Sequence, residues 1–174
     1  PVALTFPPLP DLQVAGISVT GDPSVHSGAL VTVVWQDVNV GEGATSGGWY
    51  DQVTIVNSST SETLLSRAIY FEPIADGAIS PSGSRMRSLT YRLPDGPQGT
   101  GSLQILVTAD VGNSSFEHNA AGTAEANNSL SATVNSVLAA YPDVAVHEVS
   151  GPVQAQNGQR VEVSWAVENL GNAD

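Results

Sequence analysis

The residues best suited to chemistry lie in one polar stretch, 110–128, which is rich in acids and amides. Its candidate metal ligands are Asp110, Asn113, Glu117 and Glu125, with further amides at Asn119, Asn127 and Asn128. Hard oxygen ligands of this kind suit Ca²⁺, which takes six to eight oxygens. The spacing is not that of an EF-hand loop, and the same residue types commonly cap turns. The stretch therefore predicts either a calcium site or a self-capped loop.

Nothing in the sequence points to catalysis. His26, His118 and His147 are not at ligand spacing, and no serine sits in a G-x-S-x-G turn. The absence of cysteine excludes disulfides, thiol nucleophiles and cysteine-based zinc sites. We therefore expect no enzyme activity, no catalytic residue and no cofactor other than the calcium considered above.

Two aspartates conflict with the pattern around them. Asp37 shares a strand face with Val33 and Trp35, and Asp51 shares one with Trp49. An unpaired carboxylate in a core costs several kcal/mol. Asp37 must therefore either be turned outward by a bulge, which would bring Val38 and Val40 inward, or meet an arginine. For that arginine the candidates are Arg67 and Arg92, and Asp51 poses the same problem more mildly.

The aromatic residues divide between core and surface. Trp35 and Trp49 fall on the apolar side of alternating strands, which favours core positions over a sugar-binding surface. Tyr50, Tyr70 and Tyr91 are expected to be exposed. Exposed aromatic side chains leave a carbohydrate-binding function open as an alternative.

The elements that position these residues are strands. Period-two alternation bounded by Gly, Pro, Asn, Asp and Ser predicts seven strands, at 12–19, 30–40, 49–57, 63–72, 88–93, 102–109 and 129–139. The stretch 73–85 is expected to be irregular. Seven short antiparallel strands predict an all-β, immunoglobulin-like sandwich.

The chain begins the same element twice. "PDLQV" at 10–14 returns as "PDVAV" at 142–146, and "VTVVW" at 31–35 returns as "VEVSW" at 161–165. We therefore predict a linker at 1–9, a complete domain at 10–136, a linker at 137–141 and the opening strands of a second domain at 142–174. The second copy lacks a covering sheet, so we expect it to be poorly ordered or completed by strand exchange in a dimer.

The charge limits the partners. Five Lys+Arg against 17 Asp+Glu give a net charge of −12. This balance argues against nucleic acid and against anionic membrane surfaces. No apolar run approaches the roughly 18 residues of a membrane span, so we expect no membrane insertion in this segment.

An ordered series of motifs resembles the bacterial cell-adhesion-related domain, CARDB. The series comprises Pro10-Asp11-Leu12, Val31-Thr32-Val33-Val34-Trp35, Asn39 with Gly41, Trp49, Asp51, Val53, Ile55, Thr108-Ala109-Asp110, Asn113, Phe116-Glu117 and Glu125-Ala126-Asn127-Asn128. The resemblance covers about 10–136 and begins again at 142; the stretches 73–87 and 118–124 depart from it. It implies an immunoglobulin-like sandwich, usually in tandem, in large secreted or surface proteins of prokaryotes.

The leading hypothesis is a non-catalytic module of a large exported prokaryotic surface protein, acting as a spacer or in cell adhesion. Its expected location is extracellular or at the cell surface, and its expected partners are neighbouring domains of the same polypeptide, a surface protein or a glycan. The alternatives are a module that binds carbohydrate or another ligand, and an accessory domain flanking a secreted enzyme.

Overall fold

The computed structural model describes residues 7–21 and 24–173. Residues 1–6 of the predicted linker lie outside the described residues. By its internal contacts the chain divides into two units, Pro1–Leu138 and Ala139–Asp174. Within the described ranges, no helix has the length and apolar character needed to cross a membrane.

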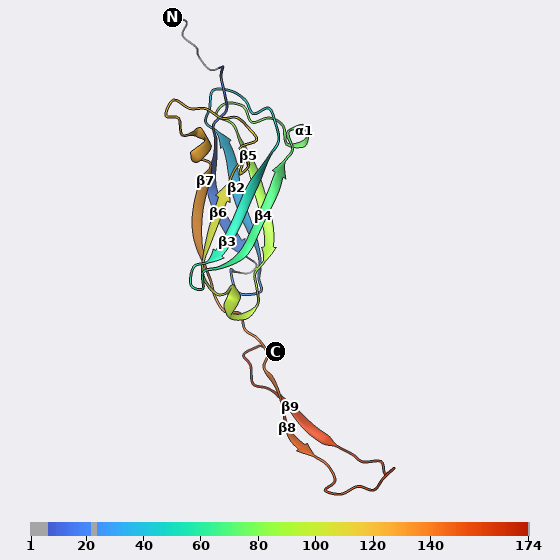
Figure 1. Cartoon of the computed structure of the whole chain (residues 1–174). Helices are drawn as coiled ribbons and strands as arrows, with labels where there is room; N and C mark the ends of the chain where they lie inside the picture. The colour runs from blue at the N-terminus through green and yellow to red at the C-terminus, as the bar shows by residue number, and fades with distance from the viewer. Residues whose placement is uncertain (1–6, 22–23, 174) are drawn as a thin grey trace, which may run out of the picture. The chain divides into compact units, whose positions relative to one another are not determined.

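The first unit consists of two antiparallel sheets packed face to face (Figure 1). The smaller sheet has the order β1 (Leu12–Gly21), β2 (Leu30–Asn39) and β5 (Ser84–Arg92). The larger has the order β4 (Glu62–Phe71), β3 (Trp49–Asn57), β6 (Gly101–Thr108) and β7 (Ser129–Ser136). The predicted all-β, immunoglobulin-like sandwich of seven strands is confirmed. Because β4 pairs with β3, the fourth strand joins the sheet of β3 and β6, unlike in a constant-type immunoglobulin domain.

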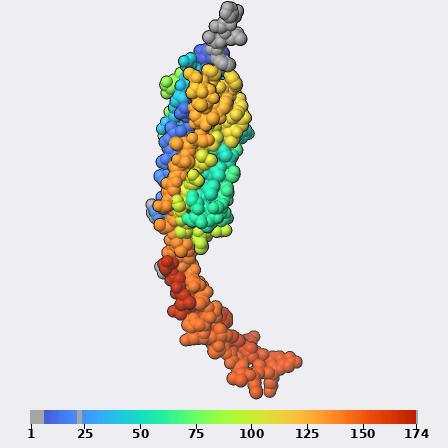
Figure 2. Space-filling model, turned by 60° about the vertical axis from the view of Figure 1, so that its left-hand side comes forward, coloured from blue at the N-terminus to red at the C-terminus, as the bar shows by residue number. Residues whose placement is uncertain are grey.

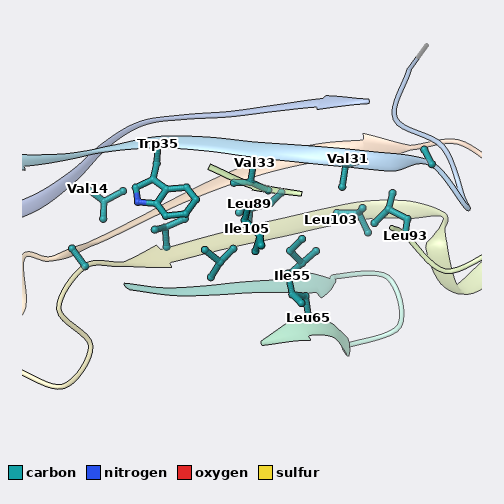
Figure 3. Close-up of a cluster of buried hydrophobic side chains, with 14 residues drawn as sticks. Val14, Val31, Val33, Trp35, Ile55, Leu65, Leu89, Leu93, Leu103 and Ile105 are labelled. Atoms are coloured by element: carbon teal, nitrogen blue, oxygen red, sulfur yellow. The ribbon is translucent and has the colours of Figure 1, made fainter. Parts of the chain in front are cut away.

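The core lies between the sheets and is built from alternate residues of each strand. Val31, Val33 and Trp35 point from β2 toward Ile55 and Ile105 of the other sheet (Figure 3). The predicted core positions of Trp35 and Trp49 are confirmed, because both side chains are fully buried.

The tyrosines follow the prediction at two of three positions. Tyr50 and Tyr70 are exposed. Tyr91 was expected to be exposed as well, but it is only partly exposed and packs against the core. Its hydroxyl donates a hydrogen bond to the Leu64 carbonyl at 2.7 Å, which gives its polar end a partner inside the sandwich.

Strand β5 begins four residues earlier than its own alternation predicts. Ser84 pairs with Val38, so β5 runs alongside nearly all of β2 and takes up the end of the stretch expected to be irregular. The rest of that stretch contains a single helical turn, α1 (Pro73–Asp76). Pairing with a distant strand decides this boundary, and local propensity does not show it. Two short 3₁₀ turns, η1 (Gly96–Gly99) and η2 (Ala124–Ala126), complete the unit.

The second unit is a two-stranded sheet of β8 (Val144–Ser150) and β9 (Ser164–Asn169). It repeats the register of β1 and β2: Val144 lies opposite Asn169 as Leu12 lies opposite Asn39. None of its described residues is buried. A pair of strands with an uncovered apolar face gains little stability by itself.

The bulge in the first strand is also repeated. The register shifts between Ala15 and Ser18 in β1 and between His147 and Ser150 in β8. Gly16 has φ 63° in the first bulge, and Glu148 has φ 53° in the second. Since a non-glycine residue rarely adopts positive φ, retention of the bulge at Glu148 shows that the backbone course is shared despite the side chain.

We expect a chain cut after Leu138 to unfold in one cooperative transition close to that of the full chain. The reason is that both buried clusters are formed by residues of the first unit. Scanning calorimetry of the two chains measures this directly. A chain cut after Thr108, which lacks β7, is the control and should lose the transition. A drop of more than about 8 °C on removing 139–174, which for a domain of this size is roughly 2 kcal/mol or more, would show that the units depend on each other.

Candidate functional site

Two aspartates from opposite sheets meet one arginine inside the first unit. Asp37 of β2 and Asp51 of β3 are both 0% exposed. The Arg87 Nε of β5 lies 3.5 Å from Asp51 Oδ2 and 3.9 Å from Asp37 Oδ2. Each aspartate also accepts from the indole N–H two residues before it: Trp35 Nε1 is 3.0 Å from Asp37 Oδ1, and Trp49 Nε1 is 2.9 Å from Asp51 Oδ1. We call these five residues the intersheet centre.

The prediction of which arginine meets Asp37 is wrong. Asp37 stays on the inner face and meets an arginine, but that arginine is Arg87 rather than Arg67 or Arg92. The early start of β5 places Arg87 opposite Trp35, whereas Arg92 pairs with Asp95 at 3.8 Å. Asp51 was expected to pose the milder conflict, yet it is as fully buried as Asp37.

Arg87 also reaches groups beyond the two aspartates. Its Nη2 donates to the Tyr70 carbonyl of β4 at 3.0 Å, and its Nη1 lies 3.5 Å from Asp76 Oδ2 at the end of α1. Its Cζ stands 5.1 Å from the centre of the Phe71 ring, which stacks on Trp49 at 3.9 Å. One guanidinium therefore ties the smaller sheet to β3, β4 and α1 of the opposite side.

Burial keeps one of the two aspartates of the intersheet centre protonated, so that the pair carries one negative charge. Burial, reinforced by the neighbouring Asp51 carboxylate, raises the pKa of Asp37 to about 8. Burial also raises the pKa of Asp51, against the opposing effect of Arg87. Among the described residues, Asp37 Oδ2 and Asp51 Oδ2 have no other hydrogen-bond partner. A proton on Asp37, donated to Asp51, satisfies both oxygens and leaves one carboxylate for one guanidinium.

The predicted metal ligands of the loop 110–128 lie in one region but serve different backbone groups. Asp110 Oδ1 and Oδ2 accept from the N–H groups of Ser114 and Ser115, at 2.8 and 2.7 Å. Glu125 Oε1 accepts from the Glu117 N–H at 2.9 Å. Asn113 is exposed, with φ 48° in the turn after β6. The described residues contain no group of three or more His, Asp or Glu side chains placed to hold a metal ion.

The same loop binds the start of β1. Glu117 Oε2 accepts from the Leu12 N–H at 2.5 Å, while Glu117 Oε1 accepts from Asn128 Nδ2 at 3.1 Å. The Asp11 carboxylate accepts from Asn119 Nδ2 at 2.9 Å and Asn127 Nδ2 at 3.0 Å. These residues, Asp11, Glu117, Asn119, Asn127 and Asn128, form what we call the N-terminal clamp (Figure 1, loop between β6 and β7).

Sequence reasoning found the loop side of this clamp but missed Asp11. Asp11 lies more than a hundred residues before its amide partners. Its place in the repeated Pro-Asp start was the one available signal. Burial, with smaller effects of Glu125 and Asp110, raises the pKa of Glu117 to about 8. A calcium site at Asp110, Asn113, Glu117 and Glu125 stays a prediction.

An asparagine that ends the first hairpin is repeated in the second. Asn39 Oδ1 accepts from the N–H groups of Asp11 and Gly41, at 3.1 and 3.0 Å. Asn169 Oδ1 accepts from those of Asp143 and Gly171, both at 2.9 Å. A Cβ at Gly41 would collide with the backbone N of Asp11, and one at Gly171 would collide with that of Asp143. The asparagine and its glycine therefore close both hairpins by the same contacts.

Replacing Arg87 should be costly, because it leaves the buried Asp37–Asp51 pair, which carries one negative charge, without a cation. We expect Arg87→Met to lower the free energy of unfolding by about 3–5 kcal/mol. Arg92→Met removes an exposed arginine of the same strand and should change it by about 0.5 kcal/mol or less. Urea unfolding of the two variants at pH 7 gives the comparison; equal losses would show that the intersheet centre contributes no specific stability.

The raised pKa values predict a stability that falls with pH. Asp37 and Glu117 hold protons in the folded state that the unfolded chain releases above its ordinary values of 3.8 and 4.5. The free energy of unfolding should therefore decrease from about pH 4 to about pH 8. Asp37→Asn keeps an acceptor for Trp35 and a donor for Asp51, so it should flatten this slope and be at least as stable as the parent at pH 8. A parent whose stability rises over this range would contradict the assignment.

Melting in calcium tests the loop. If calcium binds there, millimolar Ca²⁺ should raise Tm, and Glu125→Gln should reduce that shift. An unchanged Tm for both chains would leave the loop with its clamp contacts alone. Mg²⁺ at the same ionic strength is the control for screening.

Comparison with known proteins finds similarity in the backbone fold only. No family model matches the chain, and no curated protein matches it. The crystal structure of the CARDB domain of PF1109 from Pyrococcus furiosus, in complex with di-metal ions, is 18% identical over 78% of this chain and 100% of that one, with a TM-score of 0.48. A solution structure of a domain of an assumed cell surface protein from Methanosarcina acetivorans is 19% identical over 74% and 93%, with a TM-score of 0.38. The chain is thus similar to solved CARDB domains.

Proposed function

We propose that the first unit is a non-catalytic spacer module of a larger exported surface protein. The observation that carries this proposal is that the chain enters and leaves the sandwich at opposite ends (Figure 1). At one end, the Leu12 N–H donates to Glu117, which belongs to the loop that precedes β7. At the other end, Val137 exchanges backbone hydrogen bonds with Val25 and Ser27. Strands β1 and β7 run in the same direction, because both begin beside Glu117 and the chain that follows them meets at the hydrogen bond between Val25 and Val137. The module advances the chain by roughly 27 Å, the length of eight strand residues.

Both ends of the module are fastened by backbone hydrogen bonds to segments that are distant in the sequence. At the exit, the Ser27 N–H donates to the Val137 carbonyl at 2.9 Å, and the Val137 N–H donates to the Val25 carbonyl at 3.2 Å. At the entry, the His118 N–H donates to the Pro10 carbonyl at 3.0 Å, beside the N-terminal clamp. Tension between the two ends therefore acts on these bonds. That arrangement suits a unit which keeps its length under load.

The second unit supports a tandem arrangement. It repeats the register, the bulge and the asparagine closure of the first hairpin. We therefore propose that 142–174 is the opening of a second sandwich, and that neighbouring domains of the same polypeptide are the main partners. A strand-exchanged dimer through 142–174 is the alternative, and size-exclusion chromatography with light scattering separates the two. Placement at the cell surface rests on the sequence resemblance to CARDB.

Pulling the module by its ends tests the spacer function. We expect Asp11→Ala to leave the amides of Asn119 and Asn127 without their acceptor, to cost about 1–3 kcal/mol and to lower the unfolding force in an optical trap. Glu62→Ala, at the exposed start of β4, is the matched control and should leave the force unchanged. If Asp11→Ala unfolds at the parent's force, the clamp bears no load and the proposal loses its mechanical basis.

A further inference from the structure

The outer face of the larger sheet carries no charged side chain. The residues that point outward alternate with the buried ones: Tyr50, Gln52, Thr54 and Val56 of β3; Tyr70, Ala68 and Ser66 of β4; Ser102, Gln104, Leu106 and Thr108 of β6; Ser129, Ser131, Thr133 and Asn135 of β7. Part of this face, where β7, β6 and β3 lie side by side, is visible in Figure 2. In a chain with a net charge of −12, this is a broad neutral surface of hydroxyls and amides.

The acids of the first unit that the structure describes lie elsewhere. Glu42, Glu62, Glu72, Asp76, Asp95 and Glu125 are at strand ends, turns or loops. Asp37 and Asp51 are directed into the core. The negative potential therefore comes from the ends of the sandwich and leaves the sheet face neutral.

Two tyrosines form an exposed platform at one end of this face. Tyr50 and Tyr70 lie directly opposite each other on β3 and β4, with 51% and 46% of their surface exposed. Their ring centres are 5.0 Å apart and the planes are tilted by 49°. Gly48 leaves space for the platform, since a Cβ there would collide with the Tyr70 hydroxyl. Arg87 holds the Tyr70 backbone from the inner side.

We propose that this face binds a neutral polysaccharide, with Tyr50 and Tyr70 as its stacking platform. The apolar side of a sugar ring packs on an aromatic ring, and sugar hydroxyls exchange hydrogen bonds with serine, threonine, asparagine and glutamine side chains. The sheet supplies both kinds of group on one surface, with Gln52, Thr108 and Ser129 in the row next to the platform. Anionic polymers are disfavoured by the net charge.

A protein partner fits this face less well. Leu106 and Val56 are the aliphatic side chains larger than alanine among the outward residues named above, and they stand among hydroxyls and amides. Such a surface offers no contiguous apolar centre of the kind that anchors protein interfaces. A sugar polymer needs no such centre, because its own surface mixes apolar patches with hydroxyls.

Cosedimentation of the full chain with insoluble polysaccharides tests the proposal. The probes are cellulose and chitin, which are neutral, and covalently cross-linked polygalacturonate, which is anionic and insoluble without calcium. We expect retention on at least one neutral polymer and none on polygalacturonate. The double variant Tyr50→Ala, Tyr70→Ala should weaken retention at least tenfold, and Leu106→Asp should weaken it by placing a charge on the face.

Met86→Ala is the matched control, because Met86 is 73% exposed on the outer face of the other sheet. It should bind as the parent does. Near-ultraviolet circular dichroism and Tm of every variant establish that each is folded, and Tyr50→Phe with Tyr70→Phe keeps the rings should the alanine variant unfold. The proposal would be overturned if the parent chain bound neither cellulose nor chitin, or if the folded alanine variant bound as well as the parent. Neither result would bear on the spacer function.

Discussion

The structure of the first unit depends on one guanidinium enclosed by two carboxylates between its sheets. Arg87 draws Asp37 and Asp51 together from strands of opposite sheets, and each carboxylate is fixed by its own tryptophan. In a chain without cysteine, this contact joins the two sheets without a disulfide. Such a centre gains little over an apolar one of equal volume, but it strongly disfavours any packing that leaves a charge unpaired. It therefore fixes how the sheets face each other.

The two polar clusters act on different parts of the fold. The intersheet centre holds the layers together across the core, whereas the N-terminal clamp fastens the first strand to the loop before the last one. Both rely on carboxyl groups that are buried and that hold protons more tightly than in water. Asp37 and Glu117 thus contribute little to the negative charge below about pH 8.

The second hairpin shows which contacts belong to the hairpin itself. Its asparagine closure and bulge form without a covering sheet, so they require only the two strands and their turns. The centre around Arg87 has no counterpart there, since position 167 is valine where the first copy has Asp37. Trp165 is exposed, whereas Trp35 is fully buried. Tryptophan burial therefore depends on the opposite sheet.

The sequence alone determined the fold class, all seven strands, the repeated hairpin and the inward direction of both tryptophans, because alternation and turn residues are local properties of the chain. It also indicated that Asp37 must either turn outward at a bulge or meet an arginine. It did not identify Arg87, because that choice depends on how far β5 extends along β2, and it did not join Asp11 to the loop 110–128, because that contact spans most of the chain. Pairing partners between distant strands are set by how the two sheets pack as a whole. Only the tertiary structure could therefore decide which buried charge meets which.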